Sequence, residues 1–175
     1  MIIDDFNNTL GIWINDLEQY SMDELSARSE PQGWSLGQVY MHLLEETKYY
    51  IEQMESCLRY NDNAHGQMDD RGKVMFANNS FPDRRIKGDP FIAEKVPQPE
   101  SKVQLQKDML QLKQAIDEIG NKVVSSETVG KTAHPGHGFF SAREWLQYAE
   151  MHMRHHLKQK SRLEQELNLS RRPNS

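Results

Sequence analysis

Four segments of the chain carry apolar residues at the three- and four-residue spacing of an amphipathic α-helix, and this periodicity limits the fold most. The segments cover roughly residues 3–17, 36–60, 105–123 and 142–167. The third is the most regular, because its spacings alternate between four and three through Leu105, Met109, Leu112, Ile116, Ile119 and Val123. No segment shows the apolar–polar alternation of a strand between hairpin turns. The sequence therefore predicts an all-α fold.

Three of these segments begin with the helix-start signal known as a capping box. In this signal a serine hydroxyl accepts the backbone N–H of the third helical residue, whose own Gln or Glu side chain reaches back to the serine. The three matches are Ser35-Leu-Gly-Gln38, Ser101-Lys-Val-Gln104 and Ser141-Ala-Arg-Glu144. Because period and start signal agree on separate segments, we expect a helical bundle.

The connections between the segments are uneven in length. Residues 61–100 contain three glycines and four prolines, too many for one long helix, so we expect a long irregular loop with a short helix around 70–78. A loop of this length in a compact domain is usually functional or flexible. Residues 121–140 form a second irregular stretch, which ends in His134-Pro-Gly-His-Gly-Phe-Phe140. We expect one domain over residues 1–167, followed by a polar tail at 168–175.

Composition excludes several classes of partner. The net charge of −5 argues against a duplex nucleic-acid binder, which needs a concentrated basic face. No stretch approaches the ~20 apolar residues of a membrane span. The start, Met1-Ile-Ile-Asp-Asp-Phe6, lacks the basic-then-apolar order of a signal peptide. The single cysteine, Cys57, excludes an internal disulfide framework, so we expect a cytoplasmic protein.

Two histidines of the last helical segment, His152 and His156, are one turn apart. Residues at this spacing share a helix face, and two imidazoles so placed can hold one metal ion. Their face also carries Trp145 and Leu163, so it should point inward, where unpaired imidazoles would be costly. His155 projects about 80° to one side and is a weaker ligand candidate. The alternative is a pair of histidines satisfied by ordinary hydrogen bonds.

A third histidine, His42, lies early in the second helical segment, at the margin of its apolar stripe. Gln38, Val39, Glu46 and Tyr49 are its neighbours on the helical wheel and make a mixed, largely polar flank. A histidine in that position can face a cleft between helices. Taken alone, His42 fits a boundary histidine satisfied by hydrogen bonds better than a metal ligand.

The order of these motifs resembles the DinB-like (DinB/YfiT-like) superfamily of metalloenzymes, and within it the DinB_2-type branch. The motifs are Trp34-Ser-Leu-Gly-Gln38 before His42, then His134-Pro-Gly-His-Gly138, then Glu144-Trp-Leu146 before the His152 and His156 pair. The resemblance covers residues 1–167 and is weakest over residues 61–100. It implies a four-helix bundle with an up-down-down-up connection.

The resemblance also implies a divalent metal ion held by three histidines, which are His42, His152 and His156 in this chain. Three neutral imidazoles leave at least one coordination position for water or substrate. An all-imidazole set selects poorly among metals, so Zn²⁺, Ni²⁺ and Fe²⁺ all remain candidates.

Some members of the superfamily are thiol-dependent transferases or isomerases, so the resemblance suggests a small-molecule substrate with a low-molecular-weight thiol as cosubstrate. A metal-dependent hydrolase is a neighbouring option. The alternative from another class is a non-catalytic, stress-related bundle that binds a metal or a ligand. Bundles of this shape often associate through helix faces, which makes a homodimer compatible with the pattern.

His137 departs from the family pattern, which we expect to have an aromatic or apolar residue at this place between His134 and Gly138. We interpret it as a polar loop residue, with an extra donor near the metal as the alternative. Glu46 and Tyr49 are candidate neighbours of the site. We expect Trp34 and Trp145 to pack at helix starts, and Cys57 to be a buried, inert thiol.

Overall fold

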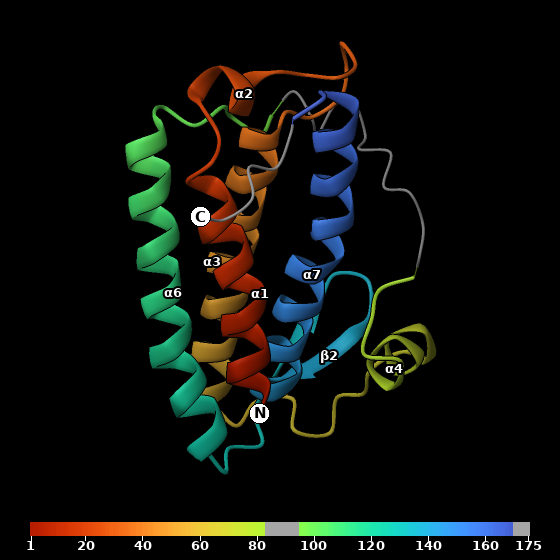
Figure 1. The fold of residues 1–175 in the computed structure, drawn as a ribbon. Coiled ribbons are helices and arrows are strands. Elements are labelled where there is room, and N and C mark those ends of the chain that lie inside the picture. The colour runs from red at the N-terminus through yellow and green to blue at the C-terminus, as the bar shows by residue number, and fades with distance from the viewer. Residues whose placement is uncertain (83–94, 170–175) are drawn as a thin grey trace.

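Four long helices lie side by side in the computed structural model, which describes residues 1–82 and 95–169 (Figure 1). They are α1 (Ile2–Leu17), α3 (Leu36–Arg59), α6 (Lys102–Ser125) and α7 (Ala142–Glu166). Each begins and ends within three residues of the predicted segment, so the helical prediction is confirmed. None of the helices in the described residues combines the length and the apolar composition needed to cross a membrane.

The helix starts follow the capping signals. Ser35 and Ser141 form complete capping boxes, with both the serine and the reciprocal Gln or Glu bond present. Ser101 accepts the N–H of Gln104, but the Gln104 side chain donates instead to Asp108 within the helix. The cap of α3 matters most for the site, because it fixes where the helix that carries His42 begins.

Two short helices lie outside the four long ones. The helix expected around residues 70–78 is confirmed as α4 (Asp70–Ala77), whose N-terminal Gly72 N–H bonds Asp69. The other, α2 (Met22–Ser26), was not predicted. At five residues it is too short to show a period, although Ser21 and Glu24 form a complete capping box at its start.

The expectation of an irregular stretch over residues 121–140 was wrong for most of its length. α6 continues to Ser125, and β1 (Lys131–His134) then pairs antiparallel with β2 (Gly138–Ser141) in a hairpin that leads directly into α7. The all-α prediction missed this hairpin because only Phe140 of its eight strand residues is fully buried, which leaves no alternation to detect.

The connection between α3 and α6 is ordered where the structure describes it. Its first part is attached to the hairpin, because Asp69 N–H donates to the His137 carbonyl and Phe139 N–H to the Gln67 carbonyl. Gly138 adopts φ +79°, and a Cβ there would lie 2.4 Å from the Gln67 oxygen, so only glycine fits this approach. Residues 83–94 of the predicted loop and most of the polar tail, residues 170–175, lie outside the described residues.

α3 packs against α6 and α7, and α1 packs against α6 and α7. Along the α3–α7 interface, His42 meets His152 while Tyr50 stacks on Trp145, so these two helices run in opposite directions. The interior contains Trp13, Trp145, Tyr40, Phe6 and Phe140, all fully buried.

Replacing Ser35 by alanine should destabilise the protein by about 1–2 kcal/mol. The Ser35 hydroxyl is buried, accepts the Gln38 N–H at 3.1 Å and donates to Gln98 Oε1 at 2.8 Å, so the change leaves both partners unpaired. Urea unfolding at pH 7 measures the loss. The control is Ser101→Ala, which removes a cap bond of the same 3.1 Å length from a solvent-exposed helix start and should have the smaller effect. Equal losses would contradict this account.

Candidate metal centre

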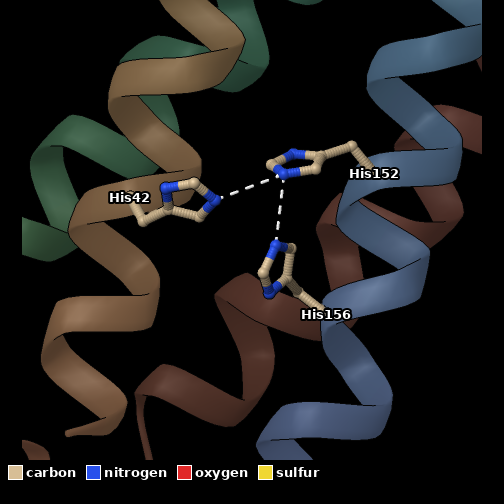
Figure 2. Close-up of side chains that lie close together, drawn as sticks. All are labelled: His42, His152 and His156. Carbon is tan, nitrogen blue, oxygen red and sulfur yellow. Dashed lines mark hydrogen bonds between the residues drawn. The ribbon is translucent and has the colours of Figure 1, made fainter. Parts of the chain in front are cut away.

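Three histidine side chains from two helices converge at the α3–α7 interface (Figure 2). His42 comes from the second turn of α3, and His152 and His156 come from adjacent turns of α7. The Nε2 atom of His152 lies 3.2 Å from Nε2 of His42 and 3.1 Å from Nε2 of His156. One ring nitrogen from each lies within 4.8 Å of the other two. The structure thus brings together the three residues named from the sequence.

The histidines are neutral at neutral pH because they are buried. His152 is 7% exposed and His156 2% exposed, as their inward-facing position on α7 predicts, and His42 is partly buried. Burial lowers the pKa of both His42 and His156 from 6.5 to about 4. Burial, together with the neighbouring imidazoles, lowers the pKa of His152 well below its usual value. Neutral imidazole is the form that binds metal ions.

The orientation of His156 is fixed by a side chain one turn away. Its Nδ1 lies 2.7 Å from Oε1 of Gln159. Because an amide oxygen only accepts hydrogen bonds, Nδ1 carries the proton and Nε2 directs a lone pair at the other two rings. A partner of this kind on the far nitrogen is typical of histidines that bind metals.

Hydrogen bonds alone leave this cluster incomplete. An N–H on Nε2 of His152 can point at only one of its two neighbours, and Nδ1 of His152 is buried with no hydrogen-bond partner among the described residues. A tetrahedral ion with nitrogen ligands at about 2.0–2.1 Å requires nitrogens roughly 3.3 Å apart, close to the 3.1 and 3.2 Å found here. The two separations that involve His152 therefore suit a divalent transition-metal ion, and the nitrogens of the third pair, His42 and His156, lie within 4.8 Å of each other.

Aromatic rings surround the histidines. The Trp34 ring lies 4.8 Å from the His42 ring, while the Tyr50 and Phe81 rings lie 5.6 and 6.0 Å from the His152 ring. Of these, only Trp34 was predicted to have a role, as a residue that packs at a helix start. Tyr50, eight residues and about two turns after His42 on α3, was not predicted as a neighbour of the site.

Glu46, named from the sequence as a neighbour, lies one turn from His42 and accepts a hydrogen bond of 2.9 Å from the Tyr50 hydroxyl. Burial and the Glu46 charge raise the pKa of Tyr148 to about 12, and burial also raises that of Tyr50. Both phenols are therefore protonated at neutral pH and act as neutral hydrogen-bonding groups. Tyr49, the other named neighbour, packs edge-on against Trp145 instead.

The remaining histidines of the two motifs lie outside the three-histidine cluster. His155 faces Phe81 with its ring centre 5.4 Å away. His137 lies in the hairpin turn with Nδ1 3.2 Å from the Asp69 carboxylate, in keeping with a polar loop residue. His134 accepts the Gly136 N–H and packs on Tyr148, and burial lowers its pKa to about 4.

Cys57 and Trp145 belong to the packing around the hairpin. Cys57 is buried, as predicted, with its sulfur 3.6 Å from the Phe140 carbonyl oxygen, and burial raises its pKa. Trp145 donates from its indole N–H to the Thr132 hydroxyl at 2.7 Å. These contacts join β1 and β2 to the start of α7.

Comparison with known families places the chain among its relatives. The family model described as the DinB superfamily matches residues 13–159, a stretch that includes all three histidines of the cluster. No curated protein matches the chain, and no solved structure does. Because the family model covers most of the sequence, the chain belongs to the DinB superfamily.

Proposed function

We propose that this protein is a divalent-metal-dependent enzyme in which His42, His152 and His156 hold the ion. The observation that carries the proposal is the convergence of three neutral imidazoles, two buried and one partly buried, in which Nε2 of His152 lies 3.1 and 3.2 Å from the other two Nε2 atoms. Zn²⁺, Ni²⁺ and Fe²⁺ are the candidate ions, because imidazole ligands bind all three.

We assign the reaction to thiol-dependent transfer or isomerisation of a small molecule, with a low-molecular-weight thiol as cosubstrate. A divalent ion with three imidazole ligands retains a coordination position for such a thiol and lowers its pKa. The chain's own thiol is unsuited to the role of nucleophile. Cys57 is bonded within the packing below the hairpin, and burial raises its pKa rather than lowering it.

The side chains around the histidines have positioning roles in this proposal. Trp34, Tyr50 and Phe81 cover the rings of His42 and His152 and limit the access of water to them. Glu46, held by the Tyr50 hydroxyl, places an acceptor one turn from His42. Metal-dependent hydrolysis and simple binding without catalysis are the outcomes that the experiments below separate from thiol transfer.

The proposal includes the up-down-down-up four-helix bundle implied by the family resemblance. The contacts of α1 support it. Thr9 hydrogen-bonds to Glu150, and Asp16, further along α1, pairs with Lys160. α1 and α7 therefore run in the same direction. Asn7 hydrogen-bonds to Asp117, and Lys102 hydrogen-bonds to the Glu18 carbonyl. α1 and α6 are therefore antiparallel.

Metal content tests the site. Protein purified without a histidine tag should hold close to one equivalent of divalent metal, and the His152→Ala/His156→Ala variant should hold almost none, because one remaining imidazole binds weakly. Elemental analysis of both provides the measurement. The matched control is His155→Ala, which removes a neighbouring imidazole outside the cluster and should keep the metal. Equal metal in wild type and double variant would refute the assignment.

The stability of the metal-free protein should fall as the pH falls from about 6.5 to about 4. His42 and His156 have a pKa near 4 in the folded protein and near 6.5 when unfolded, so the unfolded chain binds more protons in this window. Urea midpoints measured across the window should decline less in His42→Gln/His156→Gln than in wild type. His65→Gln, a change at an exposed histidine, should leave the decline unaltered. An equal decline of the urea midpoint in wild type and in the double variant would show that His42 and His156 do not cause the loss of stability at low pH.

Catalysis is tested with metal-loaded protein, a chromogenic electrophile and a panel of low-molecular-weight thiols. Formation of the thioether, with release of the leaving group and a proton, should fall to the uncatalysed rate after chelation and in His42→Ala. Turnover that survives chelation would exclude the metal-dependent mechanism. Turnover that needs the metal but no thiol would instead identify a hydrolase, and metal binding without any turnover would indicate a binding protein.

A further inference from the structure

A buried lysine lies on the same face of α7 as the two histidines. His152, His156, Lys160 and Glu164 follow one another at intervals of four residues, and all four are buried. Lys160 is 1% exposed, which is rare for a lysine unless its charge is paired.

Two partners of Lys160 come from α1 and the turn that follows it, and the third, Glu164, lies one turn further along α7. Its Nζ lies 2.5 Å from the Asp16 carboxylate, 3.0 Å from that of Glu164 and 3.4 Å from the Tyr20 hydroxyl. The Tyr20 hydroxyl in turn donates to Glu164. Asp16 and Tyr20 thus hold the C-terminal part of α7, beyond the histidine pair.

α1 also holds α7 on the other side of the histidine pair. The Thr9 hydroxyl donates to Glu150 Oε1 at 2.8 Å, and both side chains are buried. Between the two ends, the Trp13 indole N–H donates to the Met153 carbonyl at 3.3 Å. We call these bonds the α1–α7 polar contacts; they are made by Thr9, Trp13 and Asp16 of α1 and by Tyr20 just after it. Along α7 they reach from Glu150, before His152, to Glu164, after His156.

Apolar packing alone would fix α7 less tightly, because the hydrophobic effect has no directional preference whereas hydrogen bonds do. A rotation of α7 by about 10° would displace a histidine Nε2 by roughly 1 Å, given the helix radius and the length of the side chain. Metal ligands must be held within about 0.5 Å of the productive geometry. A metal site whose ligands come from both α3 and α7 thus requires that contacts with another helix fix the rotation of α7 about its axis.

We propose that α1 is the positioning helix of the metal site, and that the α1–α7 polar contacts set the distance between His42 and the His152–His156 pair. Thr9, in the middle of α1, and Tyr20, three residues beyond its end, are the positioning residues at the two ends of this set of contacts. The inference rests on the proposed metal binding by the three histidines and adds a role for side chains that do not touch the ion.

The test uses two near-isosteric changes, Thr9→Val and Tyr20→Phe, combined in one full-length protein. Thr9→Val removes the hydrogen bond to Glu150. Tyr20→Phe removes the hydrogen bond to Glu164 and the 3.4 Å contact from Lys160 Nζ, while Lys160 keeps both of its acidic partners. The metal-free protein is titrated with Co²⁺ against a competing chelator. The visible absorption of bound Co²⁺ reports the ligand geometry, and urea unfolding of the metal-free form reports stability separately.

We expect the double variant to bind Co²⁺ about tenfold more weakly than wild type, with a shifted absorption band, a loss at the lower end of the range found when hydrogen-bond partners of the ligands themselves are removed. The matched control is Asn7→Ala, which removes a 2.6 Å hydrogen bond from α1 to Asp117 of α6 without touching α7. It should retain the wild-type band and affinity even where it lowers the urea midpoint. Thr9→Ser, which keeps the hydroxyl, should restore most of the affinity lost in Thr9→Val.

Three results would overturn the inference. An unchanged band and affinity in the double variant would show that α1 only stabilises the fold, as would an affinity loss of equal size in Asn7→Ala. If the double variant does not fold, the same comparison is made with Thr9→Val and Tyr20→Phe singly. Absence of stoichiometric Co²⁺ binding in wild type would instead refute the proposed metal site itself, and with it the positioning role.

Discussion

The interface between α3 and α7 buries polar nitrogen atoms in a place that apolar side chains would otherwise fill, and this constraint governs the rest of the molecule. Removing imidazoles from water without partners is costly, so the cluster needs a ligand or a close network of hydrogen bonds. Gln159 supplies one such bond to His156, and a divalent ion would satisfy the three converging lone pairs. The caps of α3 and α7, the hairpin before α7 and the contacts with α1 all act on the position of these two helices.

The helices were predictable because two independent signals agree at most of them. Helical periodicity locates α1, α3, α6 and α7, and the serines at positions 35, 101 and 141 mark three of the starts. The hairpin was not predictable in the same way. Its strands have four residues each, and its stability derives from contacts far along the chain, such as those of Gln67 and Asp69, which no local pattern reveals.

The candidate site was predictable in part. Spacing alone pairs His152 with His156, because the helix period puts both on one face. No local pattern connects His42 with them, and the family resemblance supplied that link. The role of α1 was missed, although its signal was present. Lys160 and Glu164 continue the four-residue spacing of the histidines, and a lysine on an inward face implies an acidic partner from another element.

The pairing of the first and last long helices has a consequence for how the protein folds. The partners Thr9 and Glu150 are 141 residues apart, and His42 and His152 are 110 apart. Most helical bundles fold fast because their contacts are local, and folding slows as the average sequence separation of contacts rises. During synthesis, α1 and α3 emerge from the ribosome long before α7 is made. His42 and the polar side chains of α1 therefore remain without their α7 partners until α7 has been synthesised, so the site can assemble only after both long connections of the chain have been made.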